Sequence, residues 1–130
     1  MLRIFPTDNP SLRASLFASQ QLSPGPDGAA LVALDDGELV GACLLRMDGA
    51  TLHLLALPLG DEEDMSLADG LLRASFDYAL RRGAEIACPE SEPLRRLCES
   101  LEFLQLMQIH IKLKATISCT GCGGDHCRAD

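Results

Sequence analysis

Three apolar runs separated by two Asp-Gly turns constrain the fold of this 130-residue chain more than any other feature. The runs cover residues 29–34, 38–47 and 50–58, and the Asp-Gly pairs stand at 36–37 and 48–49. Asp-Gly between apolar runs is a strong β-hairpin signal, because both residues tolerate the positive φ angles of a tight turn. The third run is apolar almost throughout, which is typical of a central strand covered on both faces. The sequence therefore predicts a three-stranded antiparallel meander.

The clearest helix of the sequence spans residues 65–82. Its apolar side chains recur at helical spacing on one face, and charged side chains fill the opposite face. Gly83 ends the helix, since glycine is the usual residue just beyond a helix C-terminus. A short apolar run follows at 85–89, so a strand, a long helix and another strand succeed one another. Such a crossover makes its two strands parallel, and we expect residues 50–58 and 85–89 to run in the same direction.

Shorter elements complete the pattern of a single domain. They are an edge strand at 2–5, a helix at 10–21, a short helix at 91–100 and a half-buried strand at 104–118. The chain has the length of one domain, so we expect residues 1–118 to form it. Residues 119–130 then form a cysteine- and glycine-rich tail. Strands and helices together predict a mixed α+β (α/β) fold.

The charge balance excludes some classes of partner. Eleven Lys and Arg against nineteen Asp and Glu give a net charge of −8, and such a surface repels phosphate backbones. With no Trp and one Tyr, a stacking platform for single strands is also not expected. No apolar run approaches the length of a membrane span, and the first apolar stretch stops at Pro6, far short of a signal peptide. We therefore expect a cytoplasmic protein that binds neither nucleic acid nor membranes.

Residues 30–115 resemble the GCN5-related N-acetyltransferase superfamily in the order of their elements. The segment DDGELVGACLLRMDGATLHLLALP, at 35–58, is similar to the central meander of that family, whose last strand ends in a comparable x-Pro step. The segment LADGLLRASFDYALRRGAEIACPESEPLRRLCESLEF, at 67–103, resembles its long helix, next strand, short helix and terminal Gly-Phe. The resemblance implies a mostly antiparallel sheet with helices on both faces. It also implies one parallel strand pair that splays apart at a cofactor cleft.

The resemblance assigns four residues to acetyl-CoA. The backbone of Leu57 would meet the pantetheine arm, and the amides of Ser66, Leu67 and Ala68 would meet the phosphates at the start of the long helix. The family writes this phosphate-binding turn as Arg/Gln-x-x-Gly-x-Gly/Ala, and it aligns here with residues 63–68.

Two positions of that turn depart from the family pattern. Glu63 replaces the basic or amide residue, and Ser66 replaces the first glycine. The run of four acidic residues at 61–64 stands where the family meets a dianion. It is either a solvated loop whose charges favour the helix N-terminus, or a functional acidic cluster. In the first case the acids occupy the electrostatic position that the cofactor would fill.

The resemblance also points to one catalytic acid, and the strand pattern to one base. The family often carries a Tyr five residues before the Phe of its Gly-Phe pair, where it protonates the departing thiolate. Counting back from Phe103 gives Cys98, which is either that acid or a small buried residue of an amphipathic helix. His53, inside the third apolar run, is either a base that deprotonates an amine or a core histidine held by one hydrogen bond.

The tail has the residue types of a metal site. Cys119 and Cys122 have the C-x-x-C spacing with which two thiolates reach one ion, and His126 with Cys127 can close the site. Such soft ligands favour zinc or an iron–sulfur cluster. A disulfide between two tail cysteines and a tail of free thiols remain the alternatives.

Two functions follow from these features. The first is an N-acetyltransferase that moves acetyl from acetyl-CoA to a small-molecule or peptide amine, with an acidic surface that suits a cationic acceptor. The alternative is a non-catalytic acetyltransferase-like binding domain with a metal-binding or redox-responsive cysteine tail. An edge strand at about 109–117 could also pair across a homodimer.

Overall fold

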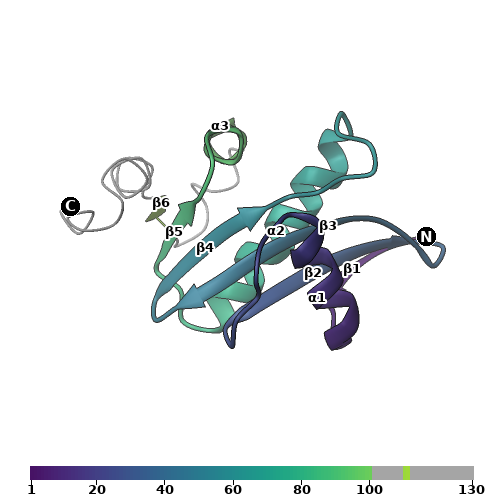
Figure 1. The fold of residues 1–130 in the computed structure, drawn as a ribbon. Helices are drawn as coiled ribbons and strands as arrows, with labels where there is room; N and C mark the ends of the chain where they lie inside the picture. The colour runs from purple at the N-terminus through teal and green to yellow at the C-terminus, as the bar shows by residue number, and fades with distance from the viewer. Residues whose placement is uncertain (101–109, 112–130) are drawn as a thin grey trace.

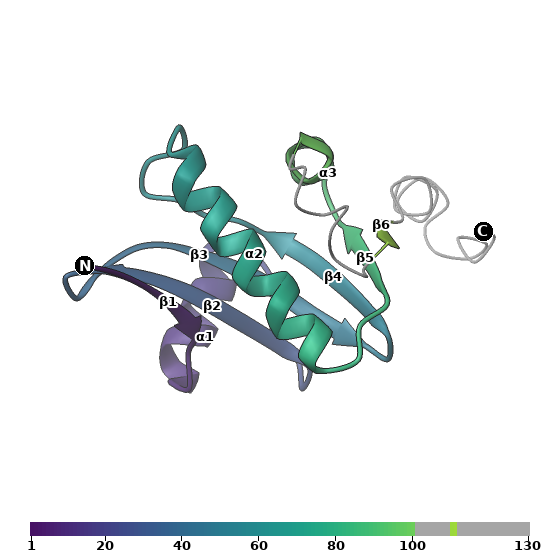
Figure 2. The ribbon, with the colours of Figure 1, turned by 180° about the vertical axis from the view of Figure 1, so that it is seen from behind.

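The computed structural model describes residues 1–100 and 110–111 of the chain. Its elements are β1 (Leu2–Pro6), α1 (Pro10–Ser19), β2 (Gly28–Asp35), β3 (Glu38–Asp48), β4 (Thr51–Ala56), α2 (Met65–Arg81), β5 (Ile86–Pro89), α3 (Glu92–Ser100) and β6 (His110–Ile111). The strands form one sheet in the order β1-β2-β3-β4-β5-β6. Figures 1 and 2 show α1 on one face of this sheet and α2 on the other. The expected mixed fold is confirmed, whereas the boundary expected at residue 118 lies outside the described residues.

The predicted meander is present as β2, β3 and β4, and each pair is antiparallel. In the first hairpin Asp36 and Gly37 both have positive φ, at 54° and 87°. Tight two-residue hairpin turns whose twist matches that of the flanking strands require such positive angles. In the second hairpin β3 extends through Asp48, so Gly49 rather than Asp48 takes the first turn position, with φ of 62°. Glycine at that position adopts the positive angle without steric cost.

The predicted parallel pair is also present. β4 and β5 run in the same direction, from Thr51 opposite Ile86 to Leu54 opposite Pro89. The helix α2 joins them across one face of the sheet, as a crossover between parallel strands requires (Figure 2). Beyond β5, the two-residue strand β6 also pairs in parallel.

Alternation along the strands divides the core into two layers. On the α1 side, Phe17 packs on a cluster of small and branched side chains from β2 and β3, namely Ala30, Val32, Ala42 and Leu44. On the α2 side, Leu71, Leu72 and Phe76 pack on residues of β2, β3 and β4, namely Leu31, Ala33, Cys43, Leu45, Leu52 and Leu54. Leu94 and Cys98 of α3 belong to this second cluster. Because side chains of a strand point alternately to its two faces, one sheet serves both layers.

A β-bulge interrupts β4 just before its end. Leu54 stands opposite Leu45 and Ala56 opposite Leu44, so Leu55 is the extra residue. A bulge bends its strand and increases the local twist. The bend lies where β4 and β5 stop pairing, and it determines the shape of the site described below. Within the described residues, no helix combines the length and the apolar composition that crossing a membrane requires.

Candidate functional site

The parallel strands β4 and β5 separate at their carboxyl ends. Leu54 and Pro89 are the last register pair, and the backbone N–H of Glu90 donates to the Leu54 carbonyl at 2.9 Å. β4 then continues through the bulge at Leu55, while the chain after β5 turns into α3. The backbone of β4 beyond Leu54 is therefore left open on the side that faced β5. An extended ligand with amide groups can pair with such an edge as an additional strand does.

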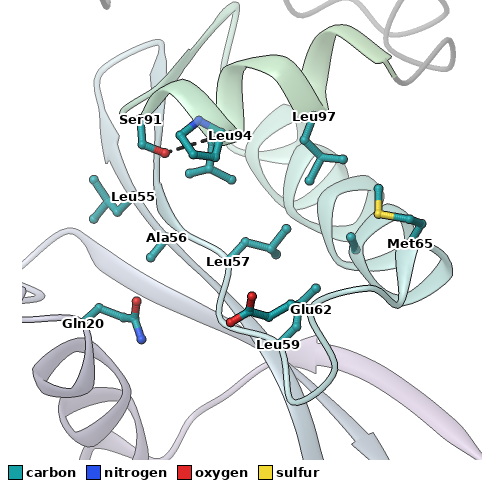
Figure 3. A pocket seen from close by; sticks show the side chains of 12 residues that line it. Gln20, Leu55, Ala56, Leu57, Leu59, Glu62, Met65, Ser91, Leu94 and Leu97 are labelled. Atoms are coloured by element: carbon teal, nitrogen blue, oxygen red, sulfur yellow. Dashed lines mark hydrogen bonds between the residues drawn. The ribbon is translucent and has the colours of Figure 1, made fainter.

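A cleft with a volume of about 490 Å³ lies at this opening. Figure 3 shows it between the end of β4, the loop before α2 and the face of α3. Its lining comprises Gln20, Leu55, Ala56, Leu57, Leu59, Glu62, Met65, Ala68, Ser91, Pro93, Leu94 and Leu97. The volume is within the range of small-molecule sites, and the mostly apolar lining is typical of them. The arrangement can hold a thin, partly apolar ligand between two strands.

The cleft brings together two of the four residues expected to bind acetyl-CoA. Leu57 and Ala68 line it, at the end of β4 and in the first turns of α2. Ser66 and Leu67 line a different hollow of about 410 Å³, together with Asp35, Glu38 and Asp61. Adjacent residues of a helix point about 100° apart, so these side chains line different hollows. The expected contacts of the three residues are made by their backbone amides, and they stay a prediction.

Carboxylates stabilise the start of α2. Asp64 is the N-cap, and its side chain accepts a hydrogen bond from the Leu67 N–H at 3.0 Å. Asp61 accepts one from the Glu63 N–H at 3.0 Å, which closes the loop before the helix. Glu62 stands on the cleft wall (Figure 3). Acidic side chains of the chain itself therefore lie at the positive end of the α2 dipole. This arrangement is the one expected if residues 61–64 form a solvated loop whose charges favour the helix N-terminus.

Cys98 lies in the core. Its exposed fraction is 1%, and it belongs to the cluster under α2. Burial raises the pKa of its thiol to about 12. Its neighbours Leu94 and Leu97 reach the cleft from the same helix. The structure therefore places Cys98 behind the cleft wall, and its role as an acid stays a prediction.

His53 forms part of a polar cluster on β4 and β5. Its Nδ1 lies 2.7 Å from Glu90 Oε2, and its Nε2 lies 4.0 Å from Asp48 Oδ2. Hydrogen bonds with Cys88 and with Glu90 raise the pKa of His53 to about 9, against a smaller opposing effect of burial. Burial by itself raises the pKa of Glu90. The hydrogen bond and charge of His53, with smaller effects of a Cys88 hydrogen bond and the Arg46 charge, together outweigh it, so the pKa is lowered. His53 is therefore a partnered histidine, and its role as a base stays a prediction.

The partners of His53 were not predicted from the sequence. Cys88 is its register partner in the parallel pair, and Glu90 comes two residues later. The signal was present in the expected parallel pairing of 50–58 with 85–89, because Cys88 and Glu90 stand on the same side of an extended chain. What could not be derived was the register. The predicted tail ligands Cys119, Cys122, His126 and Cys127 lie outside the described residues.

Comparison with known proteins gives structural matches only. No protein-family model matches the chain, and no curated protein sequence does. Ribosomal-protein-S18-alanine N-acetyltransferase from Escherichia coli is 17% identical with a TM-score of 0.60, over 78% of this chain and 77% of that one. Ribosomal-protein-alanine N-acetyltransferase from Brucella melitensis is 18% identical with a TM-score of 0.58, over 78% and 91%. An aminoglycoside acetyltransferase from an uncultured soil sample, in complex with sisomicin, is 14% identical with a TM-score of 0.56, over 81% and 86%.

These matches define the class of fold. The chain has the fold of the GCN5-related N-acetyltransferases, as its element order and its splayed parallel pair predict. Some solved relatives are longer: the match spans 62% of the IAA acetyltransferase from Bacillus cereus. A fold of this kind leaves the reaction to be argued from the site itself.

Proposed function

We propose that this chain is an N-acetyltransferase that moves the acetyl group of acetyl-CoA to an amine. The observation that carries the proposal is the cleft that opens where β4 and β5 part beside the bulge at Leu55. Acetyltransferases with this fold, among them one solved in complex with CoA, support acetyl-CoA as the donor.

In this proposal the pantetheine arm lies along the open edge of β4. Its two amides pair with the backbone around Leu57 as a short additional strand, and the apolar lining covers its methylene groups. The small side chain of Ala68 leaves room at the start of α2 for the pyrophosphate to approach, and the amides of Ser66, Leu67 and Ala68 are the proposed donors. Two of these amides are already engaged by Asp64. The Leu67 N–H donates to the Asp64 side chain at 3.0 Å and the Ala68 N–H to the Asp64 carbonyl at 3.1 Å, so binding of the pyrophosphate requires the Asp64 side chain to release Leu67 and leaves Ala68 a shared donor.

The reaction needs little covalent chemistry from the protein. The amine nitrogen attacks the thioester carbonyl, the C–N bond forms, the C–S bond breaks and CoA leaves as a thiolate. Holding both reactants in one orientation supplies most of the rate. His53, two residues before the bulge, is the proposed acceptor of the proton that the amine loses. This role requires the neutral imidazole, so Cys88 and Glu90, which raise the pKa of His53 to about 9, have to release the ring first. Cys98 is the proposed proton donor to the thiolate, which requires α3 to move because that thiol is buried.

The acceptor is a small-molecule or peptide amine. With a net charge of −8, the protein attracts cations over a distance of about one Debye length, roughly 8 Å at physiological salt. We therefore propose cationic acceptors such as polyamines and basic peptides. A homodimer that pairs the edge strand expected at about 109–117 is a further proposal, although only residues 110–111 of that segment are among the described residues. Size-exclusion chromatography with light scattering tests it.

A thermal-shift titration with acetyl-CoA tests the central claim. A ligand that binds only the native state raises the melting temperature in proportion to the logarithm of its concentration above the Kd. We expect a rising shift between micromolar and millimolar acetyl-CoA, and a smaller one with pantetheine alone because it lacks the phosphates. A melting temperature that does not change at millimolar acetyl-CoA would contradict the proposal.

One observation favours a second candidate, a non-catalytic binding domain. The Asp64 carboxylate already holds the Leu67 amide, and Glu62 stands on the cleft wall, so both acids oppose a dianion there. Assays of acetyl-CoA consumption with cationic amines separate the candidates. Turnover with any amine supports the enzyme, whereas the absence of both acetyl-CoA binding and turnover supports the binding domain.

A further inference from the structure

Three side chains with metal-binding atoms meet on β4 and β5, outside the lining of the cleft. A nitrogen of His53, the Sγ of Cys88 and a carboxylate oxygen of Glu90 all lie within 4.8 Å of one another. The parallel register sets Cys88 beside His53, and Glu90 follows on the same side of the chain. Leu52 and Leu54, the neighbours of His53, point to the α2 layer, so the cluster lies on the other face of the sheet.

That part of the sheet is accessible to an ion. Helix α1 packs over β2 and β3 on this face, whereas the cluster stands on β4 and β5 (Figure 1). The side chains of His53 and Glu90 are 18% and 33% exposed, and Cys88 is 8% exposed. A metal ion can therefore enter from solvent, while the thiol that would hold it stays largely shielded from oxidants.

The ligand types select the metal. One imidazole nitrogen, one thiolate sulfur and one carboxylate oxygen suit a borderline cation, and they suit magnesium or calcium poorly. Zinc accepts this mixture in a tetrahedral arrangement and commonly keeps a water molecule as the fourth ligand when the protein supplies three. Thiolate and carboxylate together carry two negative charges, which balance a divalent cation.

The distance between His53 and Glu90 requires a small adjustment. His53 Nδ1 and Glu90 Oε2 are now 2.7 Å apart, a hydrogen-bond distance. Two ligand atoms of one tetrahedral zinc ion lie about 3.3 Å apart, given bonds of about 2.0–2.1 Å. The partly exposed Glu90 side chain can supply this movement of roughly half an ångström by rotation.

Two further charges face the cluster. Asp48 Oδ2 lies 4.0 Å from His53 Nε2, which is longer than a hydrogen bond but close enough for the carboxylate to attract a positive charge at the cluster. Arg46, the register partner of His53 on β3, is the nearby cation, and its charge acts on Glu90. The Arg46 guanidinium opposes a bound cation, and the Asp48 carboxylate offsets it.

We propose that His53, Cys88 and Glu90 form a zinc-binding site on the face of the sheet opposite α2. The site does not depend on what the cleft binds. A zinc ion on Nδ1 excludes proton transfer at the same atom, so in the metal-bound protein His53 positions the metal and does not act as a base.

Cobalt(II) titration of the full chain tests the site, because a thiolate ligand gives cobalt a charge-transfer absorption. The predicted tail ligands would give the same signal, so the background protein carries Cys119→Ser, Cys122→Ser and Cys127→Ser. We expect one cobalt per chain, displaced by zinc, with the intensity of a single thiolate. Cys88→Ser should abolish the absorption, and Glu90→Gln should weaken binding at least tenfold.

Controls make each outcome decisive. Cys43→Ala removes a buried core thiol and should leave cobalt binding unchanged. Circular dichroism confirms the fold of each variant, and if Cys88→Ser fails to fold, the partly exposed Glu90→Gln carries the test. Cobalt absorption that survives in Cys88→Ser or Glu90→Gln with unchanged affinity would overturn the proposal. So would the loss of all absorption when only the tail cysteines are replaced.

Discussion

At the scale of single residues, the environment of a side chain decides its chemistry more than its type does. His53 and Cys98 were both candidates for proton transfer, yet the fold gives them different surroundings. His53 is half-buried between an anion and a thiol, which favours its charged form. Cys98 is 1% exposed among apolar side chains, which favours its neutral form. This difference between His53 and Cys98 leads to two predictions.

The first prediction concerns the titration of His53 in metal-free protein. Because the interactions with Cys88 and Glu90 favour the imidazolium, we expect a pKa of about 9 by NMR of the histidine ring protons. Glu90→Gln should move this pKa toward the ordinary value of 6.5. A raised folded pKa stabilises the native state below pH 6.5, and this contribution is lost as the pH rises through 9. Glu90→Gln should therefore lower the melting temperature at pH 6 more than at pH 10.

Asp48→Asn is the matched control for this titration. Its carboxylate is 79% exposed and lies farther from the ring, at 4.0 Å, so its replacement should change the pKa less than Glu90→Gln does. An ordinary histidine pKa in the unmodified, metal-free protein would show that the Glu90 hydrogen bond does not form in solution.

The second prediction concerns the buried thiols. Cys43 and Cys98 are fully buried and have raised pKa values, so at pH 8 both should stay unmodified by iodoacetamide in the folded protein. In urea both should react at the rate of a free thiol, as peptide mapping by mass spectrometry can measure. If Cys98 is labelled rapidly in the folded protein while Cys43 stays protected, Cys98 must be accessible to solvent. Its proposed role as an acid requires such access at the cleft.

At the scale of elements, α2 connects stability with the site. Its buried face joins the core under the sheet, and its first turn borders the cleft. On its exposed face, Arg73 and Arg81 form ion pairs with acids four residues earlier, each worth a few tenths of a kcal/mol. Asp64 at the N-cap stabilises the helix more, but it occupies an amide that a phosphate would need. The same side chain therefore serves the helix and opposes the ligand.

The third prediction separates these two effects. Asp64→Ala removes the cap and should lower the free energy of unfolding by about 1 kcal/mol in urea titrations. Asp64→Asn keeps a capping oxygen, so it should lose less stability while it removes the charge beside the α2 N-terminus. The exposed replacement Asp77→Ala, which breaks only an ion pair, should cost less than about 0.5 kcal/mol. Equal stability of Asp64→Ala and the unmodified protein would show that the cap contributes nothing.

At the scale of the whole molecule, the fold supplies a cleft while the surface charge opposes an anionic ligand in it. A net charge of −8 favours cationic partners, yet acetyl-CoA carries several negative charges. Affinity therefore depends on how the charge is distributed around the cleft. Glu62 is the acid on the cleft wall, so it should weaken binding more than acids elsewhere.

The fourth prediction measures this distribution. Glu62→Lys should tighten acetyl-CoA binding about tenfold by isothermal titration calorimetry, since a gain near 1.4 kcal/mol is of the order expected for two units of charge beside phosphates at a screened surface. Glu85→Lys makes the same change in net charge at an exposed position that does not line the cleft. It should change the affinity less than twofold. Equal effects of the two variants would mean that net charge alone, and not the acid on the cleft wall, governs binding.

Much of the fold was predictable from the sequence. Asp36-Gly37 between apolar runs, the helical spacing around Leu71 and Phe76, and the short run before Pro89 define the meander, the helix and the parallel strand. These signals are local, because turn conformation and apolar periodicity depend on residues close together in the chain. Leu57 and Ala68, which the family resemblance assigns to acetyl-CoA, both line the cleft, and their contacts with the cofactor stay a prediction.

Only the tertiary structure decided which side chains meet. The register of β4 with β5 sets Cys88 and Glu90 against His53, and no pattern in the sequence specifies that register. The α2 geometry likewise decided that Ser66 faces away from the cavity that Ala68 lines. Periodicity records which face of an element is buried, but contact between distant residues depends on how packed elements slide and twist against one another, and that is decided by the whole core at once.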